Sequence, residues 1–597
     1  MKVRIPLMIQ DPTTTRHHKL EKAVEGFDPD REEYFLDGPV TRRIAVLDFS
    51  PETGELVTGA TFTPPPPRRV RGWFANTAGV DLYEVGGEDM YTPNFIQVSV
   101  FATVLRTMYL FEKWETLGRP LTWAFASPQL LVVPRAGQMA NAYYHRDSNS
   151  LQFFAFTSPR DPAKTVYTSL SRDIVAHETG HAIVDGIAPD LLDACTPQSL
   201  ALHEAMADLT ALLMAFDSHT LRRIILEETG GSLKDSTDFS SIAEEFGIEL
   251  QRQGRSLRNL KNEKNLDPQS VNCVRRYEPH ALSEVLSGAL YNVMQHIHDD
   301  LKAEYAQLPE YSSREVPLFS ASGEALRKGA ERFKRMIFRA LDYLPPGEIS
   351  FADYGRALIA VDYVAYPDDE RMRNWVRSEF VRRHIVQDPT ALDAQTNVDY
   401  AALAAVDIPT LQTSDWYAYE FANANRPLLC IPPTIPFEIR PRLEVRKKRA
   451  ARDPEDSEES HECILKVAWD HVEPNPLSSR YPQERRITVG TTLALDWDTG
   501  QILAHLTSAP QIADRPVNIY QMAAQRAIVT DEYTQQRQDR DQFLQRLDRL
   551  GLLAVRRHTV EPTGQPLLST VEAEIFDDVM RVQGTGKLLH IMSLEAE

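Results

Sequence analysis

The sequence predicts an α+β protein in which a sheet-containing N-terminal lobe is followed by a helical lobe and a small α+β accessory domain. Strand-like segments dominate residues 1–84 and 121–156, whereas apolar residues between 171 and 385 recur with helical spacing. An almost entirely charged or polar run at 445–462 then precedes further strand-like sequence. A chain of 597 residues exceeds the size of a single hydrophobic core, so we expect two or three domains.

The N-terminal region, residues 1–84, reads as β-rich. Residues 43–49 are mostly apolar, Pro51-Glu-Thr-Gly54 has the composition of a turn, and residues 55–58 are again strand-like. This order predicts a hairpin over 43–58. The four prolines at 64–67 predict a stiff connector.

Residues 85–385 form the second predicted unit, with helices around a strand-like zone. Each helix is indicated by apolar residues three or four positions apart. The predicted helices cover residues 94–115, 171–187, 197–216, 281–307, 323–344 and 351–385.

The C-terminal third is predicted to hold a linker and a separate domain. Residues 386–462 read as an irregular segment that ends in a disordered, charged linker. Residues 463–597 read as an α+β accessory domain, with a hairpin at Asp496–Gly500 and a charged helix over about 531–550.

Composition excludes several classes of partner. The net charge of −20 disfavours nucleic acid and anionic membrane surfaces, which are bound by clustered Lys and Arg. No run of about 18 apolar residues suggests a membrane span. Four scattered cysteines fit a reducing compartment, so we expect a cytoplasmic protein.

One segment carries metal-ligand spacing: His177-Glu178-Thr-Gly-His181. Histidines four apart on a helix share a face and can bind one zinc ion. Glu178 lies about 100° around the helix, off the metal but beside a bound water, where it could serve as general base. Because HExxH also occurs by chance on exposed helices, it needs support from elsewhere in the chain.

Support comes 22 residues later, in an apolar helix that carries Glu204 and Asp208. These carboxylates are four apart and share a face. Burying them requires partners, and a zinc ion with its histidine is a natural pair. Glu204 is the predicted third ligand, and Asp208 is the predicted acceptor that orients a ligand imidazole. The alternative is a polar stripe facing solvent.

In these motifs the sequence resembles the thermolysin-like metallopeptidases, within the gluzincins. The resemblance covers about residues 85–385, and the late segment from Phe338 to Tyr366 is similar to the family's closing helices. Five further stretches carry it, in the family's order: Asn141–Tyr144, Asp173–Asp185, His203–Asp208, Ser256–Arg258 and Pro279–Ser283.

The resemblance implies a two-lobed thermolysin-like fold that binds one zinc ion per chain. It implies that Glu178 polarises the zinc-bound water and later delivers the proton to the leaving amine. His280 resembles the histidine that donates a hydrogen bond to the oxyanion. Alternatively, His280 is a helix N-terminal residue without a catalytic part.

The resemblance also implies a set of substrate contacts. Asn141 and the Ala142 backbone would hold an extended peptide as an added strand. Arg258 would bind a substrate carbonyl, unless it is an ordinary surface arginine. Ile174 and Leu257 would line an apolar pocket for the residue after the scissile bond.

The sequence departs from the family pattern at three places. The connection over residues 186–202 lacks the family's tyrosine, so a second oxyanion donor is missing or comes from elsewhere. The family acid before the histidine is Arg275 here, with Glu278 as a possible substitute. Asp173 matches a calcium-ligand position, but its partner carboxylate is Ala215, so calcium binding is not expected.

The predicted function is a zinc-dependent endopeptidase of restricted specificity, acting on a protein or peptide substrate. Two alternatives stay open. A zinc-stabilised scaffold with little turnover would account for the missing tyrosine, although a structural site needs no Glu178. A processing protease gated by a regulatory protein bound to 463–597 would account for the extra domain.

Overall fold

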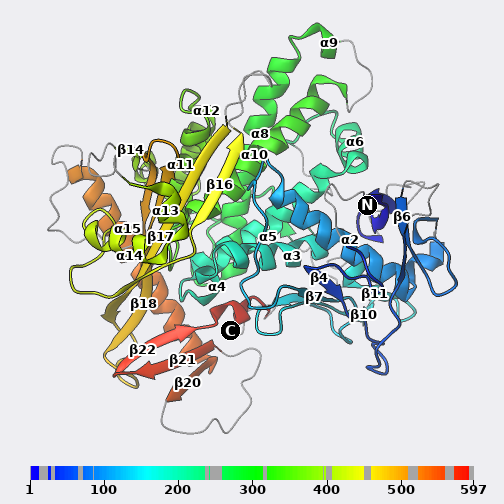
Figure 1. Ribbon diagram of the computed structural model, residues 1–597, viewed down its shortest axis with the longest axis horizontal. Helices are drawn as coiled ribbons and strands as arrows, with labels where there is room; N and C mark the ends of the chain where they lie inside the picture. Colours follow the sequence, from blue (N-terminus) through cyan, green and yellow to red (C-terminus); the bar gives the residue numbers. More distant parts are fainter. Residues whose placement is uncertain are drawn as a thin grey trace.

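The computed structural model describes a chain that mixes helices and several sheets. The described residues are 2–12, 24–27, 34–64, 71–84, 87–234, 241–242, 258–312, 319–393, 395–398, 406–448, 459–508, 522–557 and 571–590. In Figure 1 the N-terminal strands lie at the right, a long sheet lies at the left, and helices α3, α5 and α8 run between them. The predicted α+β class is therefore confirmed at this coarse level.

A four-stranded sheet lies beside the central helices. Its strand order is β4-β7-β9-β8, so β8 is at an edge. Strands β4, β7 and β9 are parallel, and β8 runs antiparallel to β9. The four strands are β4 (Ile44–Val46), β7 (Leu130–Val133), β9 (Ser150–Phe153) and β8 (Ala142–His145).

The hairpin predicted over 43–58 is not formed as a strand pair. Strand β4 pairs with β7 in parallel, with Ile44 opposite Leu130. Across the predicted turn, the chain makes an isolated antiparallel bridge between Phe49 and Leu56, with backbone hydrogen bonds from Ser50 to Glu55 and from Val57 to Asp48. The turn itself forms, but the apolar strand is taken up by the larger sheet, which buries Ile44 completely.

The central helices occur close to their predicted positions. They bury apolar faces against one another and against the N-terminal strands. Five of them are α2 (Pro93–Glu112), α3 (Arg172–Ile187), α5 (Pro197–Asp217), α8 (Pro279–Tyr305) and α10 (Ala321–Tyr343). The segment predicted as helical over 351–385 forms two helices, α11 (Phe351–Ala365) and α12 (Arg371–Arg382). Pro367 lies between them, where proline disfavours helical backbone in the residue before it.

Two of these helices, α2 and α5, are long and apolar enough to cross a membrane by length and composition alone. The most apolar window of α2 is 94% buried inside the protein, and that of α5 is 100% buried. Their composition is therefore that of helices surrounded by the protein core.

The C-terminal sheet extends across the predicted domain boundary. It has nine strands, and three of them come from before residue 463. Strands β15 (Phe437–Ile439) and β16 (Leu443–Lys448) pair with β17 (Glu459–Pro474). Strand β14 (Gln395–Val398) pairs with β19 (Ile502–Thr507).

The predicted linker over 445–462 is thus strand at both ends. Leu443 lies opposite Ile464, and Val445 is fully buried. The charged residues of β16 alternate with these apolar ones, so charge content concealed a strand with one buried face. Residues 449–458, at the centre of the predicted linker, lie outside the described residues.

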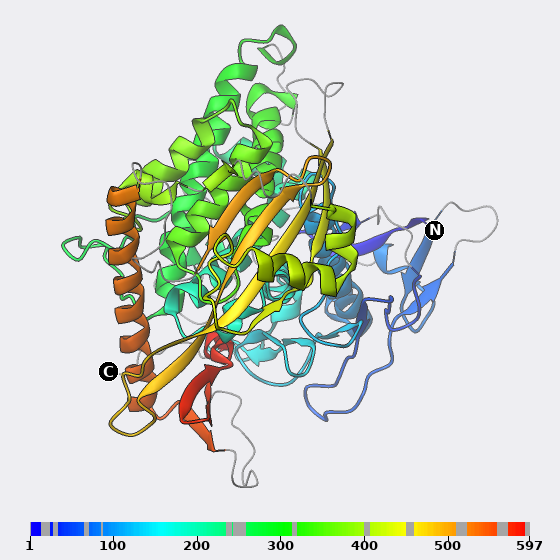
Figure 2. The same ribbon diagram turned by 60° about the vertical axis from the view of Figure 1, so that its left-hand side comes forward.

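The same sheet packs on the helical lobe. Its remaining strands include β18 (Glu484–Asp496), and the predicted hairpin at Asp496–Gly500 joins β18 to β19. The Tyr343 hydroxyl donates to Glu462 across 2.8 Å, and the Thr492 hydroxyl donates to the Leu344 carbonyl across 2.9 Å. Figure 2 shows the long strands beside the helices, with α15 (Met522–Arg549) along one side. The core is therefore shared between the two parts.

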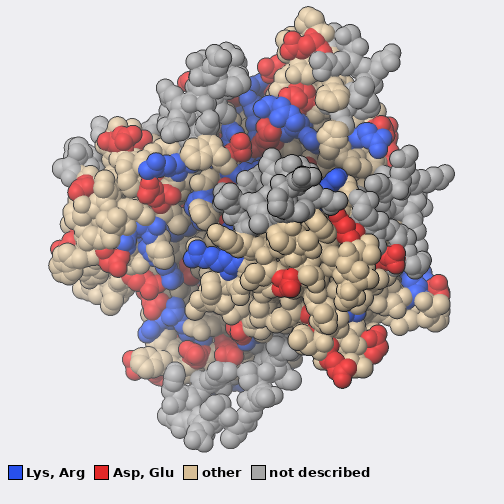
Figure 3. Space-filling view, turned by 45° about the vertical axis from the view of Figure 1, so that its right-hand side comes forward, with Lys and Arg blue, Asp and Glu red and all other residues tan. Residues whose placement is uncertain are grey.

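Charged side chains of both signs share the molecular surface. On the face shown in Figure 3, Lys and Arg are interspersed with Asp and Glu, beside a broad area of other residues.

Candidate metal centre

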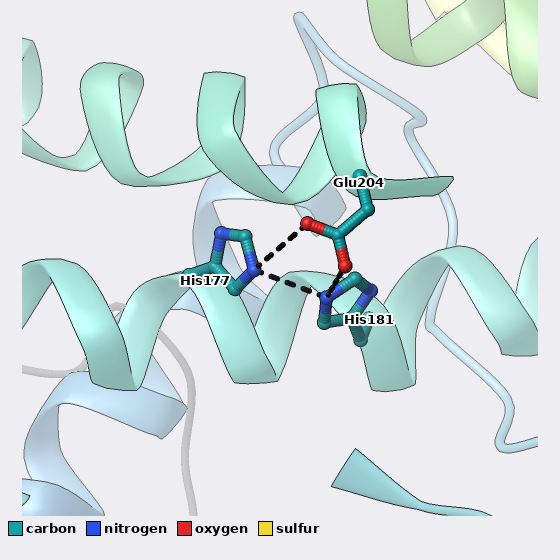
Figure 4. A group of neighbouring side chains, drawn as sticks. All are labelled: His177, His181 and Glu204. Carbon is teal, nitrogen blue, oxygen red and sulfur yellow. Dashed lines mark hydrogen bonds and ion pairs between the residues drawn. The ribbon is translucent and has the colours of Figure 1, made fainter. Parts of the chain in front are cut away.

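Three side chains from two helices converge at the centre of the molecule. His177 and His181 extend from α3, and Glu204 extends from α5 (Figure 4). The two Nε2 atoms lie 3.1 Å apart. Glu204 places Oε2 3.7 Å from Nε2 of His177 and Oε1 3.4 Å from Nε2 of His181.

These distances fit a tetrahedral metal ion. Zinc binds histidine nitrogen and carboxylate oxygen at about 2.0–2.1 Å, which separates neighbouring donor atoms by about 3.3–3.4 Å. The potential ligand atoms of His177, His181 and Glu204 lie within 4.8 Å of one another. Glu204 is only 1% exposed, and a carboxylate so deeply buried requires a compensating charge. The residues present therefore fit a zinc ion.

Helix packing brings the ligands together. A side chain at Gly180 would place its Cβ 3.1 Å from Ala207 Cα and 3.2 Å from Thr210 Cβ. Contacts this short leave no room for a side chain between α3 and α5. Glycine at position 180 thus lets the two helices approach closely, in return for a helix-propensity cost of about 1 kcal/mol.

Asp208 lies behind His177, as the sequence predicts. Its Oδ1 is 3.0 Å from Nδ1 of His177, and its side chain is fully buried. A carboxylate so close to Nδ1 favours the tautomer with its proton on that nitrogen, which leaves the lone pair on Nε2, 3.7 Å from Glu204 Oε2. The solvent-facing alternative for Glu204 and Asp208 is wrong, because both are buried.

His203 has the equivalent place behind His181, and the sequence analysis gave it no role. The Nδ1 atoms of the two rings are 2.7 Å apart. Burial lowers the pKa of His203 well below its usual value, and the nearby His181 lowers it further. A neutral His203 can accept the Nδ1 proton of His181. Its position directly before Glu204 is the signal that could have identified it.

Glu178 lies beside the three ligands and contacts the edge strand. Its Oε2 accepts a hydrogen bond from the Tyr144 backbone amide across 3.0 Å. The Glu178 side chain is buried, with 8% of its surface exposed. The contact connects the predicted general base to strand β8.

The predicted peptide-binding residues are on the same strand. Ala142 begins β8, and its backbone amide donates a hydrogen bond to Oδ1 of Asn141 across 2.9 Å. Both residues are partly exposed at the edge of the sheet. The Tyr143 hydroxyl donates to Gln152 and the Tyr144 hydroxyl to Asp185, so neither phenol points to the metal ligands.

His280 reaches the centre from a third helix. It is the second residue of α8, and its Nε2 lies 3.6 Å from Oε1 of Glu204. Its Nδ1 lies 3.4 Å from Glu278, the residue considered as a substitute for the family acid. His280 is therefore both a helix N-terminal residue and a neighbour of the candidate ligands.

The remaining predicted contacts are only partly described. Ile174 is partly buried one helical turn before His177. Arg258 begins strand β13 (Arg258–Asn259), but its side chain lies outside the described part of the chain. Leu257 also lies outside the described residues.

Asp173, at the calcium-ligand position of the resemblance, contacts the N-terminal segment. Its Oδ2 accepts a hydrogen bond from Gln10 Nε2 across 2.6 Å. Ala215, the position of the second carboxylate, is buried in the core.

Comparison with protein-family models and with curated proteins finds no match to this chain. The chemistry of the protein is therefore inferred from the side chains around the candidate metal centre.

Proposed function

We propose that this protein is a zinc-dependent endopeptidase of the thermolysin-like kind. The observation that carries the proposal is the buried set of His177, His181 and Glu204, with donor separations of 3.1–3.7 Å, and Glu178 beside it. A structural zinc site is closed by four protein ligands and needs no adjacent base. Three ligands with a neighbouring carboxylate are typical of catalytic sites, which keep one position for water or substrate.

When bound, the ion would supply Lewis acidity that polarises a peptide carbonyl and makes water nucleophilic at neutral pH. Glu178 accepts the proton of the attacking water and passes it to the leaving amine. The Tyr144 amide holds the Glu178 carboxylate in place through the bond of 3.0 Å. A positioned base of this kind contributes about 10²–10⁴-fold in rate.

His280 is placed to stabilise the negative charge that develops on the attacked carbonyl oxygen. Its Nε2 faces the metal ligands, 3.6 Å from Glu204, and Glu278 holds its other nitrogen at 3.4 Å. Fixed donors of this type contribute about 2.7–4 kcal/mol to transition-state stabilisation. With no tyrosine in the connection between the zinc helices, His280 is the principal side-chain donor in this proposal.

The substrate is proposed to be an extended peptide that adds to the edge of strand β8. Strand β8 is at the edge of its sheet, and the added chain would run past Asn141 and Ala142 toward Glu178. Arg258 and the pocket of Ile174 and Leu257 remain part of the proposal as contacts for the residues after the scissile bond.

A cytoplasmic location is also part of the proposal. All four cysteines are free, which suits a reducing compartment. An unconfined intracellular endopeptidase would damage the cell, so restricted specificity, or gating by a protein partner on the C-terminal sheet, belongs to the same proposal.

The test combines zinc analysis with cleavage of an unbiased peptide library. The proteins compared are wild type, Glu178→Gln and the control Glu227→Gln, which makes the same change at an exposed ion pair with Arg223. One zinc per chain in all three, with cleavage lost only in Glu178→Gln, is the expected result. Zinc without cleavage in wild type would favour the scaffold or the partner-gated protease. A wild-type protein that binds no zinc would overturn the proposal.

A further inference from the structure

A second cavity lies at the C-terminal end of α5, away from the metal centre. Its volume is about 160 Å³, and residues of α2, α5, α6 (His219–Glu228) and α10 line it, with one side open to solvent. Asp217, at its edge, follows Glu204 by 13 residues on the same helix, which corresponds to about 20 Å. The space is that of about five water molecules. The cavity is therefore a separate site and large enough for a small ion with several oxygens.

Two cationic side chains line this cavity without a hydrogen bond or close ion pair to a described residue. Lys334, on α10, is only 5% exposed, and its ammonium makes no hydrogen bond or ion pair with any residue that the structure describes. The Arg222 guanidinium, whose Nε is buried, likewise makes no hydrogen bond or ion pair with a described residue. Burying a charge without a close partner is costly, so Lys334, with the partly exposed Arg222 at the same cavity, requires an explanation.

The first acid at the cavity already has its own cations. Asp217 contacts Arg106 at 3.2 Å and Lys113 at 3.0 Å. Burial alone would raise the pKa of Asp217, but these two cations hold it well below its usual value. Asp217 is thus an ionised carboxylate whose closest cations are Arg106 and Lys113, and Lys334 acts on it only at longer range.

The second acid is also paired. Glu331 contacts Arg327 at 3.0 Å and Lys328 at 3.3 Å. Lys334 and Arg222 therefore add two positive charges beside acids that already have closer cations. These charges occur in a chain whose net charge is −20.

We propose that the cavity binds a small tetrahedral dianion, either free hydrogenphosphate or the phosphate group of a small phosphomonoester. The Lys334 ammonium and the Arg222 guanidinium would donate charge-assisted hydrogen bonds to its oxygens. A dianion matches the two charges of Lys334 and Arg222, and the rest of the cavity lining includes apolar side chains of α2, α5 and α10.

The test is calorimetric titration of the full-length protein with inorganic phosphate, at an ionic strength held constant with sodium chloride. The variants are Lys334→Met and Arg222→Gln. The matched control is Arg223→Gln, because Arg223 is the next residue on α6, is 47% exposed and is paired with Glu227. We expect one saturable site in wild type and in the control, with a dissociation constant at least tenfold higher in each of the two cavity variants.

The variants also separate this site from the metal centre. Phosphate bound to the metal centre would bind equally to wild type and Lys334→Met, and that result would overturn the proposal. So would an absence of saturable binding in wild type, or tighter binding of a dicarboxylate such as succinate than of phosphate. If Lys334→Met does not fold, Arg222→Gln decides alone, since Arg222 is partly exposed. Competition by glycerol phosphate at equal or higher affinity would identify the phosphomonoester as the ligand, and weaker competition would identify the free ion.

Discussion

The Nδ1 atoms of His181 and His203 lie 2.7 Å apart, so one imidazole donates a proton to the other. The buried, neutral His203 is the acceptor, which leaves Nε2 of His181 directed at Nε2 of His177. The two rings are nearly parallel, with centroids 4.9 Å apart. A residue without a predicted role thus determines how one candidate ligand presents its lone pair.

Replacing His203 by leucine is expected to weaken zinc binding by about 10–100-fold, the usual effect of losing a partner that orients a ligand. His203→Asn should retain most of the affinity, because the amide oxygen can accept the same proton. Competition with a chromophoric chelator measures both values. Equal affinities for wild type and His203→Leu would show that the contact between the rings does not orient His181.

Gly180→Ala is expected to destabilise the protein by about 1–3 kcal/mol, although alanine is the better helix former. The new Cβ would lie 3.1 Å from Ala207 Cα, and backbone of α5 would have to move. Urea unfolding measures the effect. Gly329→Ala on α10 is the control, because its Cβ meets no atom closer than 3.5 Å, and it should be neutral or stabilising. A stable Gly180→Ala variant would contradict the inferred close packing of α3 and α5.

Removing the metal should lower the melting temperature of the protein. An ion that binds only the folded state stabilises it by about 4 kcal/mol at a thousandfold excess over its dissociation constant. Chelator should therefore lower the melting temperature of wild type, whereas His177→Ala should melt at one temperature with or without chelator. A wild-type protein that chelator leaves unchanged in calorimetry would argue against a bound structural or catalytic ion.

Lys334 should make stability depend on pH in the alkaline range. Burial and the nearby Lys113 together lower the pKa of Lys334 from its ordinary value of 10.5 to about 8, against the opposing effect of Asp217. Between these pH values the unfolded chain binds more protons than the folded one, so stability rises with pH. The gain from pH 8 to about 9.5 is roughly 2 kcal/mol.

Urea unfolding of wild type and Lys334→Met, without added phosphate, checks this dependence. The free energy of unfolding of wild type should rise by roughly 2 kcal/mol relative to that of Lys334→Met between pH 8 and about 9.5. A difference that stays constant over this range would mean that Lys334 titrates normally.

The main helices could be predicted because their signals are local. Ser171 accepts a hydrogen bond from the Ile174 amide at the start of α3, and Pro197 is the first residue of α5. Each helix therefore begins where its own sequence favours it. The division of 351–385 into two helices also has a local cause, at Pro367.

The strand errors have a non-local cause. Residues 44–46 have strand character, but whether they pair with residues 55–58 or with Leu130–Val133 depends on which partner buries more apolar surface. Charge content likewise concealed β16, because a strand with one buried face needs only alternate apolar residues. The sequence signal was the alternation of Leu443 and Val445 with charged neighbours.

The sequence by itself determined that His177 and His181 share one helical face, since their spacing of four is a property of the α-helix alone. It also made Glu204 the third candidate ligand. Only the tertiary structure decided that His203 contacts His181, that Tyr144 holds Glu178 and that Lys334 is buried without a close ion pair among the described residues. Such contacts join helices and strands far apart along the chain, and their distances depend on how closely packed elements approach, which no local pattern of residues encodes.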